Sequence, residues 1–302
     1  MGKNTYVAVG NKEDLNDLIT NISPTDTPIF SMVSTTKATA TYHEWLEDEL
    51  GDVGKENKKV EGFEYTTTDP GVRTRLGNYT QIMSRGYGVT DTQETVQKHG
   101  VSSEIAYQMA KAMKLIALDC EYAYLNNDSK VAGDAITERK MGGIPYWIAS
   151  NVLVNEPNGT PTDRALTFDL IGDALQATWE DGGNPGTMVV SPMTKRIIGK
   201  MVNGATKFMD ADESRIKERI DVLETDFGTL KIVVDRWMSN GSVIILDPSL
   251  WKTAYLRPFK TFDLPKTGDN TKKVIVGELT IEARAEKANA MIKNLLATLP
   301  TS

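Results

Sequence analysis

The sequence predicts an α+β protein, and three observations support this prediction. A single long amphipathic helix is predicted over residues 103–126. Helix and strand signals alternate after residue 167, and strand signals dominate from residue 221 to residue 283. The chain before the long helix contains only short apolar runs. A body of mixed helix and sheet with a long N-terminal extension is therefore expected.

The N-terminal extension cannot build a core from its own residues. A short amphipathic helix is predicted at residues 11–19, NKEDLNDLI, because an asparagine cap precedes acids and apolar residues at helical spacing. Two prolines, Pro24 and Pro28, then interrupt the chain. The apolar run IFSMV and the threonine-rich stretch KATATYHEW follow. These apolar side chains need a partner that the segment does not supply.

Residues 51–88 have the composition of a long, polar β-hairpin. They are rich in glycine, threonine and charged residues, and the turn signal DPG at residues 69–71 separates two alternating stretches. Too few apolar side chains are present to bury a face of this hairpin. It is therefore expected to project from the body of the protein.

The helix over residues 103–126 has the clearest pattern in the chain. Ser102 and Ser103 offer N-terminal caps, and at 1.5 Å per residue the helix is about 36 Å long. The methionines of its apolar stripe are interpreted as core residues and not as part of a cofactor site. The stripe consists of Ile105, Met109, Ala112, Met113, Ile116, Cys120 and Ala123.

The remaining elements follow from glycine, proline and periodicity signals. MGGIPYWI at residues 141–148 predicts close backbone packing, since the GxxxxGK[ST] phosphate loop is missing and Pro145 disfavours a helix beginning there. A second helix is expected to begin after Ser191-Pro192, where a cap precedes a proline. The other predicted elements are a helix at residues 168–179 and strands at residues 187–190, 221–224, 229–234, 243–246 and 274–283.

Composition and charge exclude several classes of protein. The 302 residues have a net charge of −7 and mixed signs along the chain, with no dense basic stripe for tight nucleic-acid binding. A single cysteine, Cys120, excludes an intrachain disulfide. The apolar runs are too short to span a bilayer, and the first residues lack the apolar segment of a secretory signal. A cytoplasmic origin without membrane contact is expected.

Few residues suggest catalysis or metal binding. The two histidines, His43 and His99, lie in no ligand spacing, and one cysteine cannot form a thiolate cluster. No GxSxG motif is present, and Cys120 lies on the predicted apolar stripe, where it is expected to be inert. No catalytic, cofactor-binding or metal-binding residue is therefore predicted. Two acidic clusters are interpreted as solvated faces: Glu47, Asp48 and Glu49, and Asp210, Asp212 and Glu213.

The N-terminal extension also carries a resemblance. LNDLITNISPTDTPIFSMVSTTKATATYHEWLEDEL resembles the N-terminal signature of a family of tailed-phage major head (capsid) proteins. Further similarity lies in VRTRLGNYTQI at residues 72–82, in the helix at residues 103–126, in MGGIPYWI and in GELTIEARAEKANAMI at residues 277–292. The resemblance spans most of the chain, and it implies the Hong Kong 97-like capsid fold, also called the Johnson fold.

The resemblance implies a division of the chain into the parts of that fold. The axial domain would comprise residues 165–250, and residues 251–302 would return as strands to the peripheral domain. The preceding parts would be an N-terminal arm at 1–48, an extended β-hairpin loop at 49–90, and a peripheral domain at 91–164 with a spine helix at 103–126.

The implied function is that of a major capsid protein. The chain would assemble with itself, as hexamers and pentamers, into the icosahedral head of a tailed double-stranded DNA phage, enclosing the genome without binding it specifically. Scaffolding, portal or decoration proteins would be further partners, with assembly in the host cytoplasm and a final place in the virion. The arm and hairpin would lie across neighbouring subunits. The candidate inter-subunit residues are Ile29, Phe30, Trp45, Val60, Phe63, Tyr65 and Ile82.

Two alternatives remain open at this point. An encapsulin-like compartment shell has the same fold, and the contents of the particle, DNA or an enzyme cargo, would discriminate it from a phage head. A carboxylate-based hydrolase is the third reading, and it would require a deep pocket with two carboxyl groups at catalytic spacing.

Overall fold

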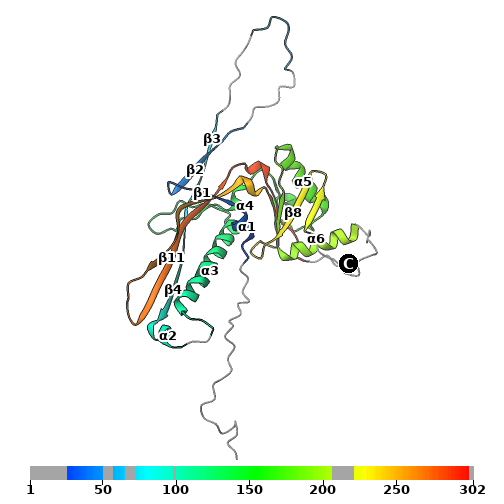
Figure 1. Cartoon of the computed structure of the whole chain (residues 1–302). Helices are drawn as coiled ribbons and strands as arrows, with labels where there is room; N and C mark the ends of the chain where they lie inside the picture. The colour runs from blue at the N-terminus through cyan, green and yellow to red at the C-terminus, as the bar shows by residue number, and fades with distance from the viewer. Residues whose placement is uncertain (1–25, 50–56, 65–71, 98–99, 206–220, 299–302) are drawn as a thin grey trace, which may run out of the picture.

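The computed structural model contains two β-sheets side by side, with a β-hairpin that projects away from both (Figure 1). The predicted helix at residues 11–19 and the predicted turn at residues 69–71 lie outside the described part of the chain. The structure describes residues 26–49, 57–64, 72–97, 100–205 and 221–298.

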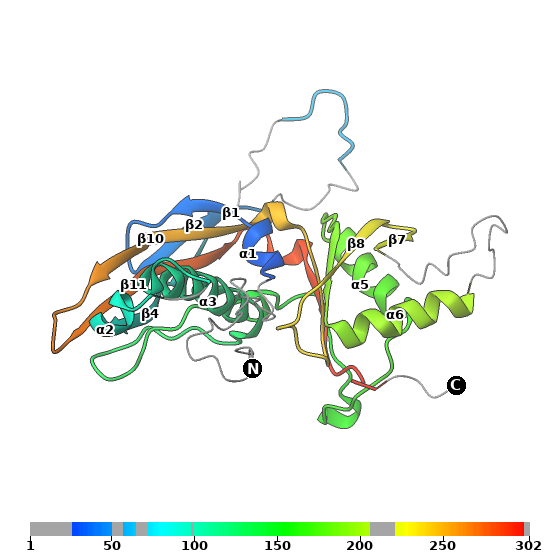
Figure 2. The ribbon, with the colours of Figure 1, turned by 60° about the horizontal axis from the view of Figure 1, so that its bottom comes forward.

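The first sheet has four strands and is covered on one face by the long helix. Its strand order is β1, β10, β11, β4, with β1 parallel to β10 and the other pairs antiparallel. The helix α3 lies along this sheet beside β4 (Figure 2). The bounds are β1 Ser34–Lys37, β4 Gln81–Thr90, β10 Trp251–Asp263, β11 Asn270–Ala283 and α3 Glu104–Asn126.

Two nearby side chains accept hydrogen bonds from the first backbone N–H groups of α3. The Ser103 side chain accepts a hydrogen bond from the backbone N–H of Ala106 at 3.3 Å, as the sequence predicts. A second acceptor is Glu94 in the short helix α2, Asp91–Thr95, whose carboxylate accepts from the N–H groups of Glu104 and Ile105. These bonds satisfy donors that the first turn of a helix leaves unpaired, so α3 begins where the sequence predicts.

The predicted apolar stripe of α3 is buried at Ala112 and from Ile116 onward, but not at its two methionines. Ile116 and Cys120 belong to the core, with 3% and 0% exposure, whereas Met109 and Met113 are 36% and 52% exposed. The expectation that the methionines fill the core is therefore wrong for these two. The buried stripe residues share a core with Ile29 of α1, Pro28–Met32, and with residues of the four-stranded sheet.

The second sheet has six strands in the order β5, β12, β9, β6, β8, β7. Helices α5, Phe168–Glu180, and α6, Pro192–Ala205, lie beside it (Figure 2). Thr167 and the predicted cap Ser191 accept from the backbone N–H groups of Leu170 and Thr194. The strands are β5 Val152–Leu153, β6 Thr187–Val190, β7 Val222–Thr225, β8 Gly228–Val234, β9 Val243–Leu246 and β12 Ala290–Ile292.

Both faces of the six-stranded sheet are buried by this same chain. Alternate residues of a strand point to opposite faces. Val189 and Ile244 join the core that contains α3, whereas Met188 and Ile245 join the core that contains α5 and α6. The six-stranded sheet is therefore the layer at which the two hydrophobic cores meet.

The observed strand pairing crosses two of the predicted domain boundaries. β12 pairs with β9, so the last strand of the segment 251–302 lies in the six-stranded sheet and does not return to the other one. β5 pairs with β12, and residues 91–164 therefore also contribute a strand to the six-stranded sheet.

The short 3-10 helices are Pro157–Gly159, Pro248–Leu250 and Glu286–Ala288.

The MGGIPYWI element confirms the expected close backbone packing. A Cβ atom on Gly143 would lie 2.7 Å from the carbonyl oxygens of Ala123 and Tyr124 and 2.9 Å from that of Asn127. Contrary to the sequence argument, a short helix, α4 Ile144–Trp147, does begin at this point, because Pro145 occupies its first turn, where no N–H donor is needed.

Replacing Gly143 with alanine is expected to destabilise the protein by about 1 to 3 kcal/mol, because the methyl group would displace backbone at the end of α3. Gly172 on α5 is the matched control, since a Cβ atom there meets no atom within 4 Å. Thermal melts of Gly143→Ala and Gly172→Ala measure the difference. Equal melting temperatures for the two variants would contradict the close approach.

Candidate assembly surfaces

The projecting hairpin consists of β2, Tyr42–Glu47, and β3, Thr74–Tyr79. The two strands pair antiparallel over six residues and belong to neither large sheet. This hairpin begins inside the segment predicted as the arm, and β4, which was included in the predicted loop 49–90, belongs to the four-stranded sheet. The projecting element is therefore residues 42–79.

Apolar side chains are exposed near the far end of this hairpin. Residues 57–64 contain a turn in which the Phe63 N–H donates to the carbonyl of Val60, with Gly62 at a φ of 83°. Val60 is 78% exposed and Phe63 is 39% exposed. Leu46 on the stem is 63% exposed. The candidate residue Tyr65 lies outside the described residues. The hairpin thus presents apolar surface that its own subunit does not bury.

The root of the hairpin is fixed by a buried asparagine. Asn78 is fully buried, and its amide donates to the carbonyls of Gly142 and Ile281, each at 2.9 Å. Its side-chain oxygen accepts from the Gly142 N–H at 2.9 Å. One side chain on β3 therefore joins the hairpin to the segment after α3 and to β11.

Charged contacts reinforce the same root. The Thr80 hydroxyl donates to Glu278 at 2.6 Å, and Glu278 also accepts from Arg139 and Arg257. The Nε2 atom of His43 lies 3.2 Å from the carboxylate of Glu282, which is on the same strand as Glu278. Because both carboxylates belong to β11, they connect the four-stranded sheet to the beginning and the end of the hairpin.

Lys130 lies among three aromatic rings at the base of the hairpin. Its ammonium group is 5.8 Å from the ring of Tyr42, 5.4 Å from Tyr146 and 5.3 Å from Trp147, and it donates to the carbonyl of Gly77 at 2.9 Å. Cation–π contacts of this kind each contribute about 0.5 to 1 kcal/mol or more when partly desolvated. The root is therefore held by ring contacts as well as by hydrogen bonds.

The root of the arm is buried in its own subunit, which corrects one expectation. Ile29 is 1% exposed and belongs to the core around α3, so its side chain is not available to a neighbouring subunit. Phe30 is half-buried with its ring 5.9 Å from that of Tyr124, and Trp45 lies 5.0 Å from Trp147. The pattern of prolines and short apolar runs concealed these contacts because all of them are made with distant parts of the chain.

One face of the four-stranded sheet is partly uncovered. Arg85 binds Asp119 of α3, so its neighbours along β4 at even positions face away from the helix. On that open face Ile82 is 50% exposed and Phe262 is 52% exposed. Among the predicted inter-subunit residues, Ile82 therefore exposes apolar surface on the body of the protein and not on the hairpin.

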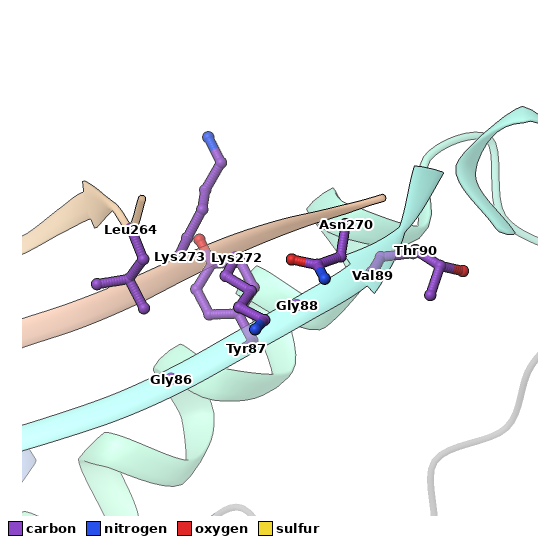
Figure 3. Close-up of a pocket in the computed structure, with 9 residues that line it drawn as sticks. All are labelled: Gly86, Tyr87, Gly88, Val89, Thr90, Leu264, Asn270, Lys272 and Lys273. Carbon is purple, nitrogen blue, oxygen red and sulfur yellow. The ribbon is translucent and has the colours of Figure 1, made fainter. Parts of the chain in front are cut away.

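A shallow groove of about 480 Å³ lies at the far end of this sheet (Figure 3). Gly86 and Gly88 leave the backbone of β4 uncovered there, and Leu264, Lys272 and Lys273 line the other side. The groove thus combines an apolar floor with the cationic side chain of Lys272, whereas the ammonium group of Lys273 is paired with Asp263 at 3.0 Å. β4 is also an edge strand of ten residues whose outer edge pairs with no other described strand.

The described residues offer little for catalysis. Among them, no group of three or more histidine, cysteine or acidic residues could hold a metal ion. Cys120 is buried, and burial raises the pKa of its thiol to about 12, so it stays protonated. Asp48 and Glu49 form ion pairs with Arg73 and Lys287. The acidic cluster at residues 210–213 lies outside the described residues.

Comparison with known proteins identifies the family. The sequence model of the SU10 major capsid protein family matches residues 2–296. The chain belongs to the SU10 major capsid protein family. It is 24% identical over 335 aligned residues to the major capsid protein of Escherichia phage Phieco32, with 95% of each protein covered. The predicted membership in the phage major capsid proteins is thereby confirmed, together with a place in the virion.

Solved structures confirm the Hong Kong 97-like fold of this SU10-family protein. The capsid asymmetric unit of cyanophage A-1(L) superposes with a TM-score of 0.73 at 11% identity, covering 94% of this chain and 97% of that one. For Microbacterium phage Oxtober96 the TM-score is 0.63 at 12% identity, with 95% and 96% covered. The SrpI encapsulin of Synechococcus elongatus PCC 7942 has a TM-score of 0.61 at 9% identity, with 98% and 96% covered.

The same fold therefore occurs in phage capsids and in an encapsulin, and the family match decides in favour of the capsid. None of the helices in the described part of the chain is both long enough and apolar enough to cross a membrane.

Proposed function

We propose that this major capsid protein assembles with itself, as hexamers and pentamers, into the closed head shell that encloses the double-stranded DNA of a tailed phage. The observation that carries the proposal is the hairpin 42–79, which is fixed firmly at its root and exposes Val60 and Phe63 near its far end. Such an element is stabilised when a neighbouring subunit buries its apolar residues.

The open face of the four-stranded sheet is the surface we propose for receiving the hairpin of a second copy. The turn at residues 57–64 exposes Val60 and Phe63, and the open face exposes Ile82 and Phe262, so both surfaces offer apolar side chains. Phe30 and Trp45 remain secondary candidates through their exposed portions.

The role we infer is structural and not enzymatic. Two of the carboxylates considered for hydrolysis, Asp48 and Glu49, form exposed ion pairs with Arg73 and Lys287. The net charge of −7 fits a protein that encloses DNA without binding it tightly. Scaffolding, portal and decoration proteins would act during assembly in the host cytoplasm.

Electron microscopy of the full chain, produced alone and with a scaffolding protein, tests the proposal. Closed shells built of hexamers and pentamers are expected. Analytical ultracentrifugation that finds only a stable, folded monomer under every condition would overturn it. An encapsulin-like compartment is distinguished by the contents of particles from the natural source, since a protein cargo without DNA would favour it.

A further inference from the structure

A buried carboxylate on the long helix holds the root of the arm. Glu121 on α3 is fully buried, and its two oxygens accept hydrogen bonds from the backbone N–H groups of Ile29 and Phe30, each at 2.7 Å. These donors belong to the first turn of α1, where backbone N–H groups have no partner within the helix. Glu121 therefore caps α1 from about 90 residues away in the sequence.

A second buried carboxylate, that of Asp235, interacts with the side chain of Glu121 through a hydrogen bond. Asp235 follows β8 and is 1% exposed, and its backbone N–H donates to the carbonyl of Val190 on β6 at 2.9 Å. One of its oxygens, Oδ1, accepts from the Trp237 N–H at 2.7 Å. The other, Oδ2, is buried and has no donor among the described residues. A proton held between Glu121 and Asp235 would supply that donor.

No cation neutralises this pair within the described part of the chain. The titratable side chains nearest to Glu121 are those of Asp235, of Cys120 and of Tyr124. The neighbouring cations are engaged elsewhere, Arg85 with Asp119 and the exposed Arg236 with Asp26. Two buried carboxylates without a cation cannot both carry a charge at low cost.

We propose that Glu121 and Asp235 share one proton and form a pH-sensitive latch that ties α1 and α3 to the six-stranded sheet. With the proton in place, the two carboxyl groups attract each other, and α1 is capped. After its loss, two like charges face each other in a buried site, and separation of the arm root and α3 from the six-stranded sheet is favoured. The latch joins three parts of the subunit that are distant in sequence.

The direction of the pH effect follows from the shifted pKa. Burial, followed by the hydrogen bond with Asp235, raises the pKa of Glu121 from 4.5 to about 8. Between these two values the folded protein holds a proton that the opened state releases. The stability of the latched state therefore falls as the pH rises from 4.5 to about 8, and it levels off above that.

Hydrogen exchange of the full-length chain tests the latch, with amide protection in residues 28–33 corrected for the intrinsic exchange rate at each pH. In the natural protein the protection is expected to fall by about tenfold per pH unit between about pH 6 and 8, and then to level off. In Glu121→Gln the profile should be flat, because a neutral amide replaces the titrating acid. In Asp235→Asn it should be shallower, because the like charge is gone but the burial remains.

Asp163→Asn is the control, since Asp163 is exposed and should leave the natural profile unchanged. A slope in Glu121→Gln equal to that of the natural protein would overturn the latch. If Glu121→Gln does not fold, Asp235→Asn decides alone, and a slope identical to the natural one would be the overturning result.

Discussion

A subunit in which residues 48–73 are replaced by a short Gly/Ser turn is expected to fold and to form no shells. The replacement keeps both strands of the stem, β2 and β3, and all contacts of Asn78 at the root. It removes Val60 and Phe63, which are exposed in the single subunit and leave no cavity behind. Because the entropy of loop closure depends only weakly on loop length, the stability of the subunit should change little.

Circular dichroism and thermal melts report the fold of this variant, and electron microscopy reports the shells. A milder version, Val60→Ser with Phe63→Ser, tests the apolar contacts alone, and Leu296→Ser, at an exposed apolar residue outside the hairpin, is its control. Regular particles from the shortened protein would show that the hairpin makes no essential inter-subunit contact. A shortened protein that cannot fold would place the segment in the core.

Asn78→Ala is expected to destabilise the subunit by about 3 kcal/mol or more, because it leaves several buried backbone groups without partners. The affected groups are the N–H and C=O of Gly142 and the C=O of Ile281, all bonded by the one side chain. The loss should appear as a lower midpoint of denaturant unfolding. The substitution should also loosen the hairpin, because it removes the buried hydrogen bonds that join the hairpin to the rest of the subunit.

The control for Asn78→Ala is Asn155→Ala. Asn155 donates to the carbonyl of Thr162 at 2.7 Å, but this bond is exposed, and water can replace it. The control should therefore lose less than about 1 kcal/mol. Similar losses for the two variants would mean that the root of the hairpin is hydrated and that Asn78 is not its main fixing point.

Local signals in the sequence were sufficient for the three longest described helices and for several short strands. Ser103 was recognised as a cap because it precedes apolar residues at helical spacing, and Ser191 because it precedes a proline. Each accepts the expected hydrogen bond. Thr167 also caps its helix, but it was not predicted to do so. Four strands of the six-stranded sheet were predicted, among them β9 as an uninterrupted apolar run, whereas β5 and β12 were not. These features depend on neighbours within a few residues.

Features that depend on distant partners could not be predicted in this way. β4 was assigned to the hairpin because Gly86 and Gly88 make it resemble a polar loop, and its pairing with β11, almost 200 residues later, leaves no local signal. The burial of Ile29 depends on α3, and the caps supplied by Glu121 come from the same distant helix. The resemblance to capsid proteins provided the fold and the function, but not these contacts.

The lengths of the edge strands bear on how such a chain avoids aggregation before assembly. The six-stranded sheet ends in β5, with two residues, and β7, with four residues, so neither edge offers a long row of free backbone groups. Short edges are a common protection against uncontrolled sheet-to-sheet association. The long free edge is that of β4, beside the open face that we propose receives the hairpin. Among the described strands of the two large sheets, β4 therefore offers the longest free edge for strand addition between subunits.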